Sequence, residues 1–260
     1  MSERAIKAPV FRSSTFEFAN AREGELFFQR AYGLPGNDGK SPGLVYSRLN
    51  NPNTEILEDK MVALEEGSEY CSAFPSGMSA ISTAIMAFVP RGGHVLYTSP
   101  VYGGTYFFLK LACPDRLGIT SSSVDTSNLD DLREAVNTAT RLDALYLETP
   151  ANPTLTMTDI ALAAAIAKEK NPDCLIFVDN TFLGPVFQSP FLHGADVVLY
   201  SATKFVGGHS DLLAGLVLTK QEELMTKING FRTIFGPVIS PDVSWMLTRS
   251  LETLWYALHY

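Results

Sequence analysis

The stretch LIFVDNTFLGPVFQSPFLHGADVVLYSATKFVGGHSD, residues 175–211, decides the fold class. It contains two short and wholly apolar segments, residues 175–178 and 197–200, and each is followed at once by polar residues. Strands that are apolar along their length are typical of a parallel sheet that helices cover on both faces. Ligands bind at the carboxyl ends of the strands in such sheets, so the residues after each strand are the first candidates for a site.

The same alternation of short apolar segments and helical stretches extends in both directions. It predicts further strands at residues 70–74, 94–98, 117–124, 144–148 and 214–219, and helices at about 77–89, after 104, at 127–136 and at about 159–170. A helix over residues 54–67 places Leu57, Met61 and Leu64 on one face and ends near Gly67. We therefore expect an α/β fold with a mostly parallel mixed sheet between helices.

The two ends of the chain differ from this central region. Residues 1–50 are predicted to form an N-terminal arm, because the Gly- and Pro-rich segment at 32–43 favours turns and loop. Residues 51–260 are predicted to form one domain. An apolar stripe from Val243 to Leu258 predicts a final helix that is still running at Tyr260, without a stop signal.

Composition excludes several classes of protein. The 260 residues are 46% hydrophobic and 18% charged, which excludes disorder, collagen and coiled coil as the main organisation. A net charge of -8 disfavours nucleic acid as a partner. The apolar segments fall short of the ~20 residues that span a bilayer, so no membrane partner is expected. Cys71, Cys113 and Cys174 form no CxxC pair, and we expect a cytoplasmic protein.

Polar residues follow several of the predicted strands. Ser76 and Gly77 come after residues 70–74, where Ser76 can cap the next helix and Gly77 lets a phosphate approach its N–H groups. Tyr102 lies on a Gly-Gly loop, and Asp179 ends an apolar strand. Taken singly, these residues are also explained as an ordinary helix cap, a surface tyrosine and a loop-fixing aspartate.

The densest group follows residues 197–200. Ser201 and Thr203 offer hydroxyls, Lys204 an amine, and Gly207 and Gly208 leave room beside them. An isolated lysine is normally a solvated surface residue. An amine, a carboxylate, hydroxyls, helix N–H groups and an aromatic ring together are the parts that hold pyridoxal 5′-phosphate (PLP). A metal enzyme is the distant alternative, because His94, His193, His209 and His259 lack ligand spacing.

Six strings of the chain resemble, in order and spacing, the Cys/Met-metabolism (trans-sulfuration) family of fold-type I PLP enzymes, which includes cystathionine γ-lyases, cystathionine γ-synthases and methionine γ-lyases. They are YSRLNNPN (46–53), SGMSAI (76–81), VYGGT (101–105), ETPANP (148–153), VDNTF (178–182) and SATKFVGGHSD (201–211). The resemblance implies an aspartate-aminotransferase-like large domain. It also implies that the smaller C-terminal domain of the family is absent.

The resemblance implies a role for each candidate. Lys204 would form the internal aldimine and move protons on the way to a ketimine, with burial helping its amine to lose its charge. Asp179 would pair with the pyridine nitrogen, and Asn152 would contact the ring hydroxyl side. Tyr102 would stack on the ring and, as a catalytic residue, would protonate the departing γ-substituent. The phosphate would be held by Gly77, Met78, Ser201 and Thr203, and by Tyr46 and Arg48 of a neighbouring subunit. Shared sites of this kind imply a dimer or a homotetramer.

The implied activity is γ-elimination on a sulfur-containing amino acid such as cystathionine or methionine. Two alternatives stay open: γ-replacement, as in a γ-synthase or an O-acetylhomoserine sulfhydrylase, and a truncated PLP-binding protein without efficient turnover. Asn53 stands where many relatives have threonine, with Thr54 as an alternative helix cap, and Gly104 stands where methionine γ-lyases typically carry cysteine. The arginine that grips the substrate carboxylate is expected in the missing domain.

Overall fold

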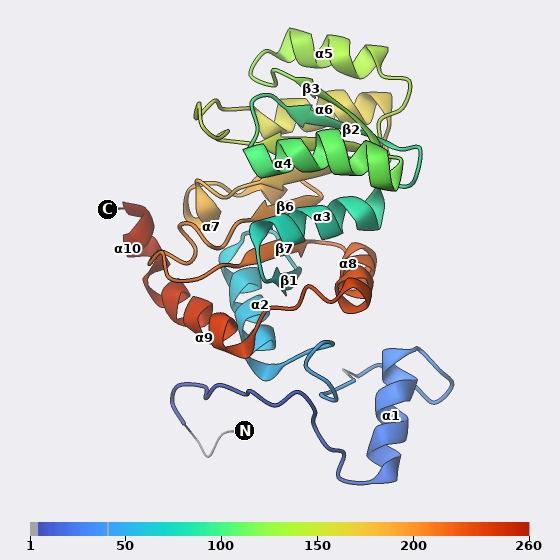
Figure 1. The fold of residues 1–260 in the computed structure, drawn as a ribbon, viewed down its shortest axis with the longest axis vertical. Coiled ribbons are helices and arrows are strands. Elements are labelled where there is room, and N and C mark those ends of the chain that lie inside the picture. Colours follow the sequence, from blue (N-terminus) through green and yellow to red (C-terminus); the bar gives the residue numbers. More distant parts are fainter. Residues whose placement is uncertain (1–4, 41, 260) are drawn as a thin grey trace.

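A seven-stranded sheet forms the centre of the computed structural model, which describes residues 5–40 and 42–259 (Figure 1). The strand order is β1-β7-β6-β5-β4-β2-β3, and β7 alone runs antiparallel to its neighbours β1 and β6. The strands are β1 (Tyr70–Phe74), β2 (His94–Thr98), β3 (Thr120–Val124), β4 (Ala144–Glu148), β5 (Leu175–Asp179), β6 (Val197–Tyr200) and β7 (Gly215–Thr219). The predicted fold class, a mostly parallel mixed sheet, is confirmed.

Helices cover both faces of this sheet (Figure 1). One face packs against α3 (Gly77–Phe88), a π-helix (Phe108–Leu117) that continues α4 (Gly103–Phe107), and α8 (Glu222–Phe235). The other packs against α2 (Pro52–Leu64), α5 (Leu129–Thr138), α6 (Ile160–Lys170) and α9 (Pro241–Ser250). The remaining helices are α1 (Ala21–Ala31), α7 (Gly184–Phe187), α10 (Leu254–His259) and the 3₁₀ turns Pro190–His193 and Leu251–Thr253.

Strand residues alternate between two hydrophobic clusters, one on each side of the sheet. In β5, Ile176 and Val178 belong to the cluster under α2, α6 and α9, whereas Phe177 belongs to the cluster under α3 and α8. Because successive strand residues point to opposite faces, Asp179 at the end of β5 shares the face of Phe177. Glu148 at the end of β4 shares the same face, because it pairs with Asp179 in register. Both carboxylates therefore lie beside α3.

Several helical segments differ from the sequence-based expectation, and the short α7 and the 3₁₀ turn Pro190–His193 are among those that were not predicted. Helices α1 and α8 were not predicted; α8 is interrupted in sequence by Asn229 and Gly230, but it buries Leu224, Met225 and Ile228 against the sheet. The final helix, predicted to be continuous, breaks at the 3₁₀ turn Leu251–Thr253, and the helix after residue 104 becomes a π-helix. Packing on the sheet decides α8, because local propensity is a weak determinant beside burial. Helix α1 instead begins at a local signal that sequence reasoning missed, because Asn20 accepts the N–H of Glu23 at the helix start.

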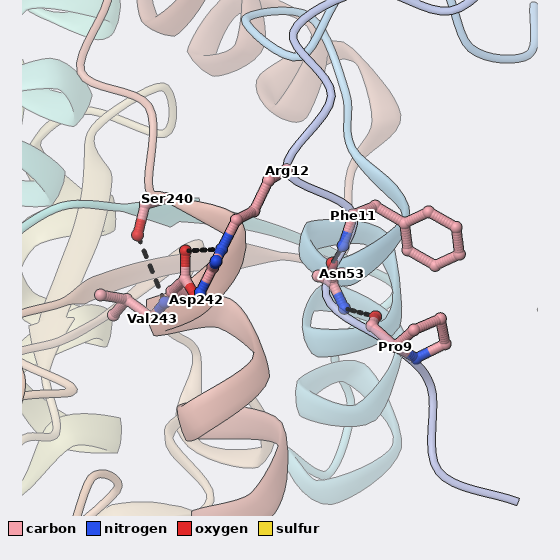
Figure 2. Close-up of polar contacts among 7 residues, drawn as sticks. All are labelled: Pro9, Phe11, Arg12, Asn53, Ser240, Asp242 and Val243. Carbon is pink, nitrogen blue, oxygen red and sulfur yellow. Dashed lines mark hydrogen bonds and ion pairs between the residues drawn. The ribbon is translucent and has the colours of Figure 1, made fainter. Parts of the chain in front are cut away.

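The N-terminal strap, which we define as residues 7–12, fastens the arm to α2 and α9 (Figure 2). The Asn53 side chain accepts the N–H of Phe11 at 2.7 Å and donates to the carbonyl of Pro9 at 2.8 Å. The guanidinium of Arg12 forms an ion pair with Asp242, at 2.6 Å, on the first turn of α9. The Asn53 side chain thus donates one hydrogen bond to the backbone of the strap and accepts another from it. Asparagine in place of the threonine of many relatives therefore has a structural role here.

Asn51, rather than Thr54, caps α2. Its side chain accepts the N–H of Asn53 at 2.9 Å and donates to the carbonyl of Phe11 at 2.9 Å. The hydroxyl of Thr54 instead lies 3.2 Å from that of Ser244 on α9. The expected alternative cap is therefore wrong, because the helix begins at Pro52, two residues before Thr54.

Other structural findings concern cysteines, membrane spans and metals. The three cysteines are free and buried. Within residues 5–40 and 42–259, no helix combines the length and the apolar character needed to cross a membrane. The same described residues contain no group of three or more His, Cys, Asp or Glu side chains placed to hold a metal ion.

Candidate functional site

A cavity of about 180 Å³ lies where the carboxyl ends of β4, β5 and β6 meet the first turn of α3. A wider hollow of about 1000 Å³ adjoins it and shares four lining residues with it, Phe182, Thr203, Lys204 and Leu213. Eight of the ten residues predicted to bind the cofactor line the smaller cavity, and so does Ser76; the eight are Gly77, Met78, Tyr102, Asn152, Asp179, Ser201, Thr203 and Lys204. The fold thus brings together segments that are more than a hundred residues apart.

The first turn of α3 forms one wall. Ser76 caps the helix by accepting the N–H of Ser79 at 3.1 Å, as the sequence predicts. The N–H groups of Gly77 and Met78 have no acceptor among the described residues. A Cβ atom on Gly77 would come within 2.8 Å of the Cβ of Ser201, so the two segments approach closely only because residue 77 is glycine. Free N–H groups at a helix N-terminus are suited to an anion.

Asp179 is a buried carboxylate, only 7% exposed. It accepts hydrogen bonds from the Tyr146 hydroxyl at 3.0 Å and from the Thr181 N–H and hydroxyl at 3.1 and 2.5 Å. Burial raises the pKa of Asp179, and the bonds from Thr181 counteract part of that effect. No Lys or Arg forms an ion pair with it among the described residues. A buried carboxylate that lines a cavity without a cationic partner is suited to a cationic ligand group.

Glu148 lies beside Asp179 and is 4% exposed. Its carboxylate accepts the backbone N–H of Tyr102 at 3.0 Å and that of Asn152 at 2.7 Å. Burial, followed by the charge of Asp179, raises the pKa of Glu148 to about 7. The sequence predicts a strand that ends at Glu148, but Glu148 was not assigned to the site. A polar residue at the carboxyl end of an otherwise apolar strand, directly before Thr149 and Pro150, was the signal that could have indicated its role.

Lys204 lies in the turns that follow β6, with its side chain exposed. Its backbone N–H donates to the Ser201 carbonyl at 3.0 Å, and its amine has no hydrogen-bond or ionic partner among the described residues. The expected burial of this side chain is therefore not seen in the structure. Strand β6 ends at Tyr200, so Lys204 lies beyond the core, where the cavity opens into the wider hollow.

Three further candidates differ in detail from the sequence-based expectation. The Thr203 hydroxyl donates to the Ala214 carbonyl at 3.2 Å and accepts the Ala214 N–H at 3.1 Å, so its donor is already engaged. Tyr102 is the residue before α4 rather than part of a flexible loop, and it is 47% exposed. Asn152 makes its hydrogen bond to Glu148 through the backbone and is among the residues that line the cavity.

Tyr46 and Arg48 do not line this cavity. The Arg48 guanidinium lies over the Tyr46 ring, 5.5 Å from its centroid, and donates to the carbonyl of Thr233 at 2.7 Å. Both side chains are exposed on the arm. The fold therefore separates these two residues from the other eight within one chain.

Comparison with known proteins identifies the family. The model of the Cys/Met metabolism PLP-dependent enzymes matches residues 1–259. The chain belongs to this family. The cofactor of the family is pyridoxal 5′-phosphate, and the resemblance seen in the six sequence strings is confirmed.

Relatives of known name include two from Bacillus subtilis. The chain is 41% identical over 250 residues to its cystathionine γ-lyase, and 43% identical over 250 residues to its cystathionine β-lyase MetC. These alignments cover 96% of the chain and 60% and 58% of the relatives, so the chain spans about 60% of their length. Among solved structures, the chain is similar to the crystal structure of cystathionine γ-lyase from Lactobacillus plantarum complexed with L-serine. The two sequences are 35% identical and the TM-score is 0.81, and the match covers 95% of this chain and 58% of that chain.

The residues of the cavity fit PLP. The unpaired N–H groups of Gly77 and Met78 offer donors to a phosphate, and Gly77 leaves the space that a Cβ atom would fill. At the other side, the buried Asp179 offers an anionic oxygen to a protonated ring nitrogen. The unpaired Lys204 amine lies on the same cavity. Anion donors, a cation acceptor and an amine are therefore present together.

Proposed function

We propose that this chain is the cofactor-binding part of a PLP-dependent lyase that cleaves a carbon–sulfur bond by γ-elimination, with cystathionine or methionine as the substrate class. The observation that carries the proposal is the joint cavity of Lys204, Asp179, Tyr102 and the α3 N-terminus. The named γ-lyase relatives support γ-elimination, and the named β-lyase relative makes β-elimination the first competing reaction. γ-Replacement remains the alternative that the sequence leaves open.

Each cavity residue has a distinct task in this proposal. When bound, PLP supplies an electron sink that stabilises negative charge at carbon atoms of the amino acid. Asp179 keeps the ring nitrogen protonated, and Tyr102 and Asn152 orient the ring from the cavity wall. Lys204 holds the cofactor and moves a proton at the carbon atoms of the substrate. Gly77, Met78 and Ser201 bind the phosphate, and Thr203 joins them when its hydroxyl turns from the Ala214 carbonyl to the phosphate.

We also propose that Tyr46 and Arg48 bind the phosphate in a neighbouring subunit of a dimer or tetramer. Their exposure on the arm and their distance from the cavity of their own chain support this arrangement. Arg48 is suited to the task, because a guanidinium binds phosphate oxygens in a bidentate manner. A cytoplasmic location is proposed as well, and the acidic composition and the three free, buried cysteines support it.

Cofactor binding tests the first part of the proposal. PLP is titrated into the chain and followed by absorbance; borohydride then fixes it to its lysine, and peptide mass spectrometry locates the attachment. We expect attachment at Lys204, loss of attachment in Lys204→Ala, and normal attachment in Lys227→Ala, which removes an exposed lysine of α8. Attachment elsewhere, or none, refutes the proposed site.

Product analysis tests the reaction. Incubation with cystathionine or methionine should release 2-oxobutyrate if the sulfur leaves from Cγ, whereas pyruvate from cystathionine indicates departure from Cβ. O-acetylhomoserine with a thiol tests γ-replacement. PLP attachment at Lys204 without any product identifies a PLP-binding protein without turnover, which is the alternative of another class.

A further inference from the structure

One buried carboxylate joins two loops at the cavity wall. Glu148, at the end of β4, accepts the N–H of Tyr102 at 3.1 Å on Oε1 and 3.0 Å on Oε2, and the N–H of Asn152 at 2.7 Å on Oε1. Tyr102 follows β2, and Asn152 follows β4, so the two donors come from separate segments. The Glu148 side chain therefore bridges segments that no strand pairing connects at this point.

These bonds are the main polar restraints on the two residues. Asn152 makes no other hydrogen bond among the described residues, and Tyr102 makes one more, in which its carbonyl accepts the N–H of Tyr106. Half of the Tyr102 side chain is exposed. Without Glu148, both backbone segments would lose the bond that fixes their position relative to β4.

The carboxylate of Glu148 is buried although burial of a charged group is unfavourable. Burying a carboxylate next to Asp179 is costly, and this cost is seen in the raised pKa of Glu148, about 7. Hydrogen bonds from the two N–H groups favour the charged form and lower the same pKa. A carboxylate can accept both bonds with the oxygens that one strand end presents, which an apolar residue cannot do.

We propose that Glu148 is a positioning residue, which holds Tyr102 and Asn152 at a fixed spacing on the cavity wall before a ligand arrives. The inference rests on the proposed function, since that function places these two residues against the PLP ring. Glu148 lines the cavity, but its hydrogen bonds are directed to backbone, so its effect on the ring passes through Tyr102 and Asn152.

Amide hydrogen exchange of the cofactor-free chain tests the restraint directly. In Glu148→Ala, we expect exchange at the N–H groups of Tyr102 and Asn152 to accelerate about tenfold or more, because the shared acceptor of both groups is lost. Glu148→Gln keeps an acceptor oxygen and should restore slow exchange at these two sites. Glu134→Ala removes an exposed carboxylate of α5 and should change neither.

PLP titration of the same variants gives the second readout. The dissociation constant should rise about tenfold in Glu148→Ala and less in Glu148→Gln. Unchanged exchange at Tyr102 and Asn152 in Glu148→Ala overturns the inference, and so does an equal acceleration throughout the sheet, which indicates general destabilisation. If Glu148→Ala does not fold, Glu148→Met, of similar length and without an acceptor oxygen, replaces it under the same criteria.

The two proposals fail in distinguishable ways. If the unmodified chain does not bind PLP, the proposed function fails, while exchange in the cofactor-free chain still decides whether Glu148 restrains the two loops. If PLP binds at Lys204 and its dissociation constant is the same in Glu148→Ala, the proposed function stands and the positioning role is refuted.

Discussion

Replacing Glu65 by glutamine should change how the stability of this protein depends on pH. Glu65 follows α2 and is 1% exposed. One oxygen of Glu65 accepts a hydrogen bond from the Tyr200 hydroxyl, and the other has no partner among the described residues. The Tyr200 hydroxyl in turn accepts a hydrogen bond from the side-chain amide of Asn180 at 2.7 Å. Burial raises the pKa of Glu65 from 4.5 to about 7, although the bond from Tyr200 lowers it in part.

The sign of the pH dependence of stability follows from how many protons the folded and the unfolded chain bind. Between pH 4.5 and 7, the unfolded chain has lost the Glu65 proton, while the native chain retains it. The native state then binds more protons, so the free energy of unfolding falls as the pH rises through this range and levels off above it. A pKa difference of this size corresponds to roughly 3 kcal/mol. Glu148 contributes in the same direction, because its pKa is raised to a similar value.

Urea denaturation from pH 4.5 to 8, followed by tryptophan fluorescence, measures the effect. Glu65→Gln should lose part of the pH-dependent fall, because Glu148 and Asp179, whose pKa values are also raised, still titrate. Glu66→Gln, at the exposed neighbouring position, should keep the full fall. An identical slope in Glu65→Gln and the unmodified chain would refute the reasoning, since it would show that Glu65 titrates normally in the folded protein.

Three further substitutions test the cavity, the strap and a partly buried ion pair. Gly77→Ala brings a Cβ atom to 2.8 Å from Ser201 and should weaken PLP binding at least tenfold in a titration, whereas Gly103→Ala, with no atom within 4 Å, should not. Asn53→Ala removes both bonds to the N-terminal strap and should lower the free energy of unfolding by about 1–3 kcal/mol in urea denaturation. Arg232→Ala removes the ionic partner of the partly buried Glu58, 2.6 Å away, and leaves that carboxylate with the N–H of Ala73 as a donor. It should lower the free energy of unfolding by about 1–3 kcal/mol, and a loss below about 0.5 kcal/mol would contradict the importance of this pair.

Much of the architecture could be predicted from the sequence because it depends on local patterns. The strand segments LIFVD and VVLY are apolar over four or more residues, and Ser76 is a cap residue before a helical pattern. Such signals need only neighbouring residues to be interpreted. Helix α8 carried no clear signal, since Asn229 and Gly230 obscure a pattern that becomes evident only when its apolar face lies on the sheet.

For the site, the sequence alone indicates which types of residue are present and not how they are arranged. The motifs identified the family and the amine, carboxylate, hydroxyls and glycine that the cofactor requires, because the chemistry restricts which side chains serve. The roles assigned to these residues stay predictions, and so does the division of the chain at residue 50.

Only the tertiary structure decided how these groups are arranged. It placed Tyr46 and Arg48 away from the cavity, left Lys204 exposed, and engaged the Thr203 hydroxyl with Ala214. It also showed that Glu148 joins the loops of Tyr102 and Asn152, 46 and 4 residues away along the chain. The physical reason is that hydrogen bonds and burial depend on which strands lie side by side, and the order of strands in a sheet is not encoded in any local segment.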